Sequence, residues 1–269
     1  MEIKDSLLKN GEISFIPSPN FGSEFQVPPD TIIVHYTAGG SAESAIQTFT
    51  NPSSKASAHL IIGRSGAITQ MVPFNKIAWH AGESQYEGRT GFNKYSIGIE
   101  IDNAGILEKS GDKYLSWFGR VYPENEVVYA THRNEFSPRY WHLYTEVQIE
   151  LVENVCELLM EYYPIKSILG HEEISPGRKT DPGPAFPLDK IRMRLLGPKR
   201  DSDGPENIPD QEMSVMVDGL NIRLLPDVNS EKIAKPLSKN QKVKIVEKQS
   251  GWVKVTTSIT GWVSEMYLK

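Results

Sequence analysis

Residues 170–184, with the sequence GHEEISPGRKTDPGP, hold an imidazole, an ammonium and a carboxylate in one short stretch. They follow an apolar run, residues 165–169, that is typical of a short buried strand, and their density of glycine and proline predicts a loop of fixed shape. His171 and Asp181 lie too far apart for one helical face, but a loop braced by proline can fold back and bring both to one point. We therefore expect two ligands of one zinc ion here, with at least one more ligand from elsewhere in the chain.

Two earlier stretches each place an imidazole or a carboxylate in the pattern of a buried strand. Residues 31–36 (TIIVHY) are mostly β-branched or apolar and include His35. The small residues that follow predict that His35 lies at the mouth of a cleft. Residues 96–101 (SIGIEI) are interrupted by Glu100, and a glutamate is rarely buried unless it is paired or functional. Both residues are therefore candidates for a functional site.

The remaining patterns alternate strands with helices. Ser41 is suited to cap a helix over residues 42–50. Residues 103–143 have weak periodicity, so we predict an irregular excursion there, with one strand at residues 127–131. Further predicted elements are a hairpin of residues 58–62 with 67–72, a long helix over 144–163 and a short helix over 188–196.

Length and composition are those of a globular protein. The 269 residues give room for one large and one small domain, and 39% hydrophobic and 23% charged residues are ordinary values. No run is long enough to span a bilayer and residues 1–10 lack the features of a secretory signal, so we expect a chain that is made soluble in the cytoplasm. The single cysteine, Cys156, excludes an internal disulfide and a thiolate metal cage, and its place in the long helical pattern predicts a position beside the core.

The C-terminal residues differ from the rest in charge and in pattern. Residues 197–212 are rich in Pro, Gly, Asp and Ser, which predicts a linker. Residues 213–269 contain nine Lys or Arg and five Asp or Glu, about +4, which leaves about -9 for the remainder of a chain with net charge -5. This basic charge suggests an anionic partner, with incidental surface charge as the alternative. Strand patterns at residues 219–225, 241–248, 252–256 and 261–263 predict a small β-barrel.

Six short motifs follow one another along residues 30–190. They are Ile33-Val34-His35, Ser57-Ala58-His59, Val72-Pro73-Phe74, AWHAG at 78–82, SIGIE at 96–100, and Gly170-His171 followed by KTDPGP at 179–184. In this order they resemble the zinc-dependent N-acetylmuramoyl-L-alanine amidases of the AmpD and phage-lysozyme-like type, which share a fold with peptidoglycan recognition proteins. The resemblance implies an α/β fold, with a mixed central β-sheet flanked by helices. Residues 213–269 resemble a bacterial SH3-type domain through GLNIR at 219–223 and GWV at 261–263.

The resemblance implies roles for five residues. It makes His35, His171 and Asp181 the zinc ligands. It makes Glu100 the catalytic carboxylate and Lys179 the residue that stabilises charge on the attacked carbonyl. Three ligands of N and O type leave a fourth position for water, whose pKa a catalytic zinc lowers to about 7. Glu100 would take the proton as hydroxide attacks the lactyl carbonyl, then return it to the departing amine, without a covalent intermediate.

Four further residues are candidates for substrate binding. His59 and His80 lie in family motifs, where each either supports a metal ligand or packs in the core. Arg64 and Arg89 lie in loops where an arginine either binds the muramic-acid carboxylate or the peptide, or is solvated at the surface.

The excursion at residues 103–143 is longer than the connection expected in the family. We therefore expect it to wall the substrate groove. Its two histidines, His132 and His142, match no motif and are predicted not to be metal ligands.

Together these patterns predict a catalytic domain at 1–196, a linker at 197–212 and an SH3-like cell-wall-binding domain at 213–269. The expected activity is zinc-dependent hydrolysis of the bond between N-acetylmuramic acid and L-alanine in peptidoglycan or muropeptides, with no nucleic-acid partner. Degradation of the wall, as by a phage endolysin released through a membrane lesion, and recycling of anhydromuropeptides stay open. The alternative is a non-catalytic peptidoglycan-recognition protein, which is expected to lack a metal ligand or the acid/base residue, whereas Asp181 and Glu100 are both present.

Overall fold

The chain divides into two compact units, Met1–Gly197 and Pro198–Lys269. The computed structural model describes residues 1–9, 13–197, 212–224, 230–249 and 252–257. Most of the predicted linker and the predicted strand at 261–263 lie outside these residues. Within the described ranges, none of the helices combines the length and the apolar character that crossing a membrane requires.

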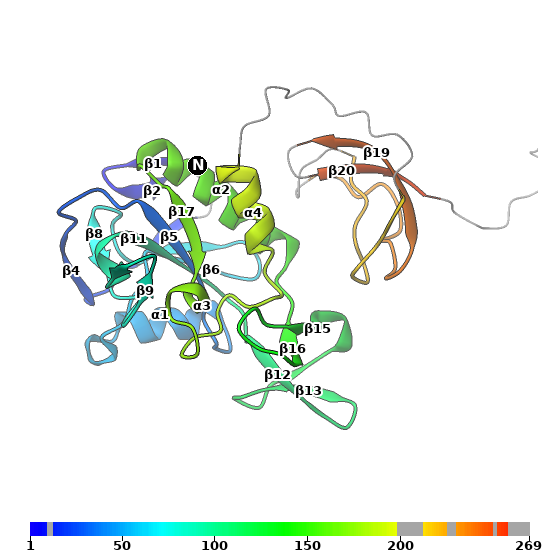
Figure 1. Ribbon diagram of the computed structural model, residues 1–269, viewed down its shortest axis with the longest axis horizontal. Coiled ribbons are helices and arrows are strands. Elements are labelled where there is room, and N and C mark those ends of the chain that lie inside the picture. Colours follow the sequence, from blue (N-terminus) through cyan, green and yellow to red (C-terminus); the bar gives the residue numbers. More distant parts are fainter. Residues whose placement is uncertain (10–12, 198–211, 225–229, 250–251, 258–269) are drawn as a thin grey trace, which may run out of the picture. The chain divides into compact units, whose positions relative to one another are not determined.

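The first unit is built on a six-stranded sheet in the order β17–β5–β11–β6–β7–β3 (Figure 1). Strands β17, β5, β11 and β6 run parallel, whereas β6 and β7 form the predicted antiparallel hairpin. Parallel strands are buried on both faces, which explains their nearly continuous apolar runs. The predicted α/β class with a mixed central sheet is confirmed. The bounds are β3 (Ile13–Phe15), β5 (Thr31–Tyr36), β6 (Leu60–Ile62), β7 (Ile68–Gln70), β11 (Ser96–Ile101) and β17 (Ser167–Gly170).

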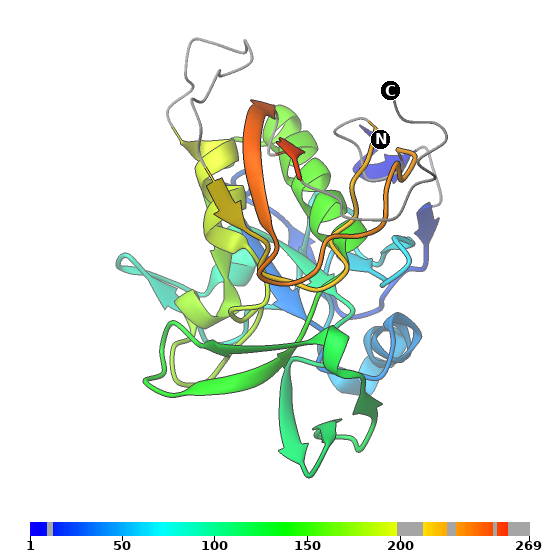
Figure 2. The same cartoon turned by 90° about the vertical axis from the view of Figure 1, so that its right-hand side faces the viewer.

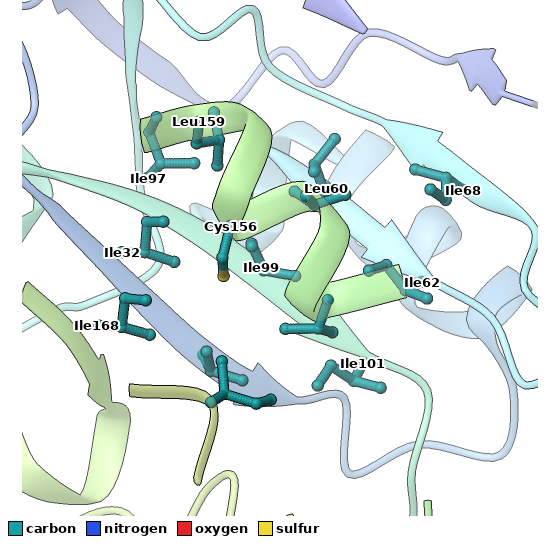
Figure 3. Close-up of a cluster of buried hydrophobic side chains, with 14 of the residues drawn as sticks. Ile32, Leu60, Ile62, Ile68, Ile97, Ile99, Ile101, Cys156, Leu159 and Ile168 are labelled. Atoms are coloured by element: carbon teal, nitrogen blue, oxygen red, sulfur yellow. The ribbon is translucent and has the colours of Figure 1, made fainter. Parts of the chain in front are cut away.

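Helix α2 (Glu146–Tyr162) covers one face of this sheet. Thr145 and Gln148 form a capping box at its start, which explains why the helix begins where the sequence pattern predicts. Its apolar stripe packs against side chains that alternate along the strands (Figure 3). Cys156 is fully buried in this core, as predicted. The stripe consists of Val152, Val155, Cys156 and Leu159, and the strands contribute Ile32, Leu60, Ile97, Ile99 and Ile168 among others.

Helix α1 (Ala42–Thr50), capped by Ser41 as predicted, contributes to a separate apolar cluster. Its Ala45 and Phe49 cluster with Ile61, which alternates with the β6 residues that pack in the α2 core. The two faces of the sheet are therefore covered by different elements. The other elements of this unit are β1 (Glu2–Lys4), β2 (Leu7–Lys9), β4 (Phe21–Glu24), β8 (Lys76–Ala78), β9 (Gln85–Tyr86), β10 (Arg89–Thr90), α3 (His171–Ile174), α4 (Leu188–Leu196) and the 3-10 turns Pro52–Ser54, Phe92–Lys94 and Glu124–Glu126.

The excursion at residues 103–143 is not irregular, so that prediction is wrong. It forms an antiparallel sheet of five strands in the order β14–β13–β12–β16–β15, which Figure 2 shows below the central sheet. Only β15 was predicted. The pattern was weak because these short strands bury few side chains each, too few for a regular alternation. The strands are β12 (Ile106–Ser110), β13 (Lys113–Ser116), β14 (Val121–Tyr122), β15 (Val127–Thr131) and β16 (Pro138–His142).

The described part of the second unit contains an antiparallel sheet of β18 (Glu212–Ser214), β19 (Lys242–Gln249) and β20 (Trp252–Thr256). The last two agree with the predicted strands. The predicted strand that starts at Gly219 is not a continuous strand over its described residues, which have isolated bridges at Leu220 and Arg223 and backbone hydrogen bonds with residues 231–237. Gly219 itself has a φ of 77°, a turn conformation that interrupts an extended strand. Val215, Leu237 and Val243 form the buried cluster of this unit.

Candidate active site

His35 and Glu100 are neighbours on one face of the central sheet. Strands β5 and β11 pair in parallel with Glu100 directly beside His35. Ile32 and Val34 pack in the core under α2, and because side chains alternate along a strand, His35 and Glu100 face away from that helix. The pairing of these strands therefore places the imidazole of His35 and the carboxylate of Glu100 side by side.

The stretch after β17 brings two more side chains to His35. His171 opens the one-turn helix α3, so residues 170–184 are not wholly the loop that the sequence predicted, and Asp181 lies in the returning segment. His35 Nδ1 lies 2.9 Å from His171 Nδ1 and 2.9 Å from Asp181 Oδ2, and His171 Nδ1 lies 2.9 Å from the same oxygen. All three residues are buried, and among the described residues they form a group with the spacing of metal ligands.

The hydrogen bonds around the imidazoles leave three acceptor atoms facing one another. His171 Nε2 donates to Ala81 O at 3.2 Å, so His171 Nδ1 holds a lone pair. His80 Nε2 faces Ser96 O at 3.4 Å, and His35 Nε2 lies 2.9 Å from His80 Nδ1. With His80 donating to Ser96, His35 Nε2 donates to His80 and His35 Nδ1 also holds a lone pair. Two lone pairs and a carboxylate oxygen repel one another unless a cation lies between them, so this donor set fits a metal ion.

The pKa values of this group agree with that arrangement. Burial and the neighbouring His171, against the opposing carboxylate of Asp181, lower the pKa of His35 to about 4. Burial raises the pKa of Asp181, but the close contacts with His171 and His35 outweigh it and hold this pKa below its usual value. Neutral imidazoles and an ionised carboxylate are the forms that bind metals.

Two of the predicted substrate-binding residues are histidines with different surroundings. His80 contacts His35. Its ring packs against Gly98, and a side chain at that position would not fit because a Cβ on Gly98 would lie 2.5 Å from the His80 ring. His59 is fully buried, and both of its ring nitrogens are used: Nδ1 accepts from Gly98 N at 3.0 Å and Nε2 donates to Lys76 O at 2.9 Å. His80 therefore supports His35, whereas His59 has no ring nitrogen left for a substrate.

A cleft of about 390 Å³ opens over the group and contains Glu100 and Lys179. Glu100 Oε2 is buried and has no hydrogen-bond partner among the described residues. Burial and the carboxylate of Asp181, against the opposing ammonium of Lys179, raise the pKa of Glu100 to about 8. An unpaired carboxylate oxygen at a cleft is placed to accept a proton. Other lining residues are Tyr36, Ala38, Phe49, Trp79, Arg178 and Thr180.

The two predicted arginines do not lie together. Arg89 forms an ion pair with Asp30 at 3.0 Å and stacks on Tyr95 with its guanidinium carbon 4.2 Å from the ring centre. It is not among the described residues that line the cleft. Arg64 donates to Leu143 O at 3.0 Å and lines a second pocket.

The excursion sheet braces the segment that carries the predicted ligands, which the sequence did not indicate. Glu172 is buried, with His132 Nε2 2.6 Å from Glu172 Oε2 and Arg133 Nε 2.8 Å from Glu172 Oε1. The amide of Gly183 also donates to Glu172, at 3.1 Å. His132 and Glu172 lie 40 residues apart, and no local pattern links them. His132 and His142 both lie outside the candidate metal group.

Comparison with known proteins identifies two family matches. Residues 25–184 match the family described as N-acetylmuramoyl-L-alanine amidase, and residues 218–269 match the bacterial SH3 domain. The chain is 38% identical over 144 residues to the 1,6-anhydro-N-acetylmuramyl-L-alanine amidase AmpD of Escherichia coli K12. This alignment covers 53% of this chain and 58% of that protein. It is 29% identical over 175 residues to the N-acetylmuramoyl-L-alanine amidase AmiD of the same strain, over 62% of this chain and 53% of that one.

A solved structure shares the fold of the first unit. The crystal structure of a selenomethionine derivative of AmpD has a TM-score of 0.51 and 28% identity, and the match covers 71% of this chain and 98% of that chain. The alignments with the two curated relatives span a little over half of each relative's length.

Proposed function

The chain belongs to the N-acetylmuramoyl-L-alanine amidase family, and we propose that it hydrolyses the amide bond between N-acetylmuramic acid and L-alanine, with one zinc ion as cofactor. One observation carries the proposal: the cleft that contains His35, His171 and Asp181 also contains Glu100, whose buried Oε2 is unpaired. A metal site alone is compatible with a structural role. An acid/base group beside it favours hydrolysis.

The zinc ion would be held by His35 Nδ1, His171 Nδ1 and Asp181 Oδ2, a set of N and O ligands that is typical of catalytic zinc. When bound, zinc supplies a Lewis acid that polarises a carbonyl and lowers the pKa of a water molecule to about 7. His80 would hold the ring of His35 in the orientation that this ligand set needs, through the bond at His35 Nε2.

Glu100 would move the proton. Its Oε2 accepts a proton from the attacking water and then delivers it to the nitrogen of the departing L-alanine, so the carboxylate returns to its starting form. The desolvated surroundings that raise its pKa make it a stronger base than an exposed glutamate. Lys179, which lines the same cleft, would stabilise the negative charge that develops on the carbonyl oxygen.

The substrate would be a muropeptide or the wall polymer. The AmpD relative is named for a 1,6-anhydro-N-acetylmuramyl substrate, which supports muropeptides. The second unit matches the bacterial SH3 family and its residues 213–269 carry about +4, which supports attachment to an anionic wall.

The test uses the zinc-loaded full chain with purified muropeptides and with intact sacculi, followed by mass spectrometry of the products. The expected products are a free N-acetylmuramoyl acid and a peptide with a free N-terminal alanine. The variant Glu100→Gln is the matched control because it keeps the shape of the side chain. Products cut at any other bond, or no cleavage of either substrate, would refute the proposal.

A further inference from the structure

Glu172 is a buried carboxylate that the proposed mechanism does not use. It comes directly after His171 on the one-turn helix α3 and is 2% exposed. A carboxylate is rarely buried unless opposite charge and hydrogen-bond donors compensate for the water that it loses. The donors around Glu172 therefore indicate what this side chain does.

Glu172 joins the two arms of the segment that carries His171 and Asp181. Its amide N–H donates to Asp181 O at 2.8 Å, and its Oε2 accepts the amide N–H of Gly183 at 3.1 Å. These two bonds fix the backbone at Asp181 and two residues beyond it. The stretch of backbone from which the Asp181 carboxylate extends is therefore held by Glu172.

The excursion supplies the other partners of Glu172 through one turn, residues 132–137, which joins β15 to β16. His132 Nδ1 accepts the amide N–H of Asn134 at 3.2 Å, so the ring proton lies on Nε2. That Nε2 donates to Glu172 Oε2 at 2.6 Å. Arg133 Nε donates to Glu172 Oε1 at 2.8 Å, and Asn134 Nδ2 donates to Glu172 O at 2.9 Å. Consecutive residues of one turn therefore converge on Glu172.

Packing adds to these bonds. Trp141 of β16 is 1% exposed and stacks on His132, with the ring centres 5.6 Å apart and the ring planes 19° from parallel. The same indole lies against Gly183, where a Cβ would lie 2.8 Å from the Trp141 ring. Gly183 has a φ of 71°, which glycine adopts without strain. The excursion therefore contacts the backbone beyond Asp181 directly as well as through Glu172.

The outer side of Arg133 faces a different set of carboxylates. Arg133 Nη1 lies 2.5 Å from Glu173 Oε1, and Arg133 Nη2 lies 3.2 Å from Asp189 Oδ2. The side chain of Asp189 is 71% exposed, and exposed ion pairs contribute little to stability. A change at Asp189 therefore alters this network without removing a partner of Glu172.

We propose that Glu172, held by His132 and Arg133, is a positioning residue for the metal site, and that zinc binding and docking of the turn at 132–137 stabilise each other. The turn fixes the carboxylate of Glu172, and this carboxylate fixes the backbone that presents Asp181. Coupling of two such events is reciprocal: bound zinc favours the docked turn by the factor by which the docked turn favours zinc. The inference rests on the zinc site of the proposed function.

The first measurement is the dissociation constant for zinc of the full chain, by competition with a chromogenic chelator. We expect Glu172→Gln, and in a separate protein His132→Leu, to raise this constant by about ten-fold or more, as is typical for groups that support metal ligands. Glutamine keeps the size of the side chain, but its one carbonyl oxygen cannot accept from His132, Arg133 and Gly183 together.

Two further variants show whether the carboxylate contact itself is responsible. His132→Gln replaces the ring by an amide that can donate to Glu172, so we expect it to bind zinc more tightly than His132→Leu does. Asp189→Asn is the matched control. It removes a charge from the outer side of Arg133 and is expected to keep the dissociation constant for zinc within about three-fold of the parent value.

The second measurement is amide hydrogen exchange of residues 131–138, with and without zinc, in the parent and in both Glu172→Gln and His132→Leu. We expect zinc to slow exchange of this turn in the parent and to have a much smaller effect in the variants. A network that only stabilises the fold would lower the stability of the metal-free variants and leave their response to zinc like that of the parent. Glu172→Gln is the conservative change, so the comparison does not depend on folding of the leucine variant.

Two results would overturn the inference. One is a dissociation constant for zinc in Glu172→Gln that equals that of Asp189→Asn, and the other is exchange of residues 131–138 that zinc leaves unchanged in the parent. A parent chain that binds no zinc would reject the zinc-dependent function and the inference together. Zinc binding with the expected differences, but without cleavage of muropeptides, would reject the proposed hydrolysis alone.

Discussion

His35 Nε2 lies 2.9 Å from His80 Nδ1. The imidazole predicted to supply one metal ligand is therefore hydrogen-bonded, through its other ring nitrogen, to a second imidazole. His80 reaches this position across Gly98, where a side chain would collide with its ring. Groups that bond the far nitrogen of a ligating histidine fix its tautomer and orientation, and their loss typically weakens metal binding 10- to 100-fold.

We therefore expect His80→Ala to raise the dissociation constant for zinc by roughly 10- to 100-fold. Competition with a chromogenic chelator measures this constant. His59→Gln is the control, because His59 is an equally central histidine that bonds only backbone atoms. The supporting role of His80 would be wrong if both variants weakened zinc binding to the same extent.

Glu100→Gln is expected to keep the zinc content and to lower turnover by roughly a hundred- to ten-thousand-fold. The amide keeps the size of the side chain but cannot accept the proton from water. Zinc content is measured by atomic absorption and turnover by chromatography of the released peptide. Turnover within a few-fold of the parent would assign the base to another group.

Removal of the metal is expected to abolish hydrolysis, and one equivalent of zinc is expected to restore it. The reason is the His35, His171 and Asp181 group, whose facing acceptor atoms fit a single cation. Titration of zinc into chelator-treated protein gives both the stoichiometry and the recovered rate. Full activity in protein shown to be free of metal would contradict the predicted cofactor.

Stability should depend on pH through His59. Burial lowers its pKa to about 4, against the opposing hydrogen bond to Lys76 O, while an unfolded histidine titrates near 6.5. Below that value the unfolded chain binds a proton that the native state excludes, so this contribution is complete above about pH 6.5 and is lost as pH falls towards 4. Its full size is about 3 kcal/mol.

The measurement is the free energy of unfolding by urea between pH 7 and pH 4, in metal-free protein. His59→Gln is expected to be less stable at pH 7, because it disturbs two buried hydrogen bonds, but to lose less stability on acidification than the parent. Equal losses in parent and variant would show that His59 takes up a proton in the native state.

Removal of residues 198–269 should separate binding to the wall from catalysis. The two units are compact in themselves, and a second contact on a tether raises the local concentration of the catalytic unit at an insoluble substrate. We expect nearly unchanged cleavage of soluble muropeptides but weaker pelleting with sacculi, with the larger deficit at low salt, where charge attraction is least screened. Loss of activity on soluble muropeptides would instead indicate a structural role.

The amino-acid sequence by itself determined the main strands and helices of the central sheet and the face on which the candidate site lies. His35 in residues 31–36 and Glu100 in residues 96–101 interrupt apolar strand patterns, and the alternation of side chains already places both opposite the apolar core. The two helices at 42–50 and 188–196 were predicted with their observed bounds. These features are local, because capping and periodicity act over a few residues.

Only the tertiary structure decided which side chains meet. The contact of His80 with His35, the pairing of Arg89 with Asp30 and the hydrogen bond of His132 with Glu172 join segments that no short pattern relates. The excursion sheet was missed for the same reason, since its short strands bury few side chains each and are stabilised by pairing with one another. Contacts between distant segments depend on how strands pair and helices pack, and local periodicity carries no information about them.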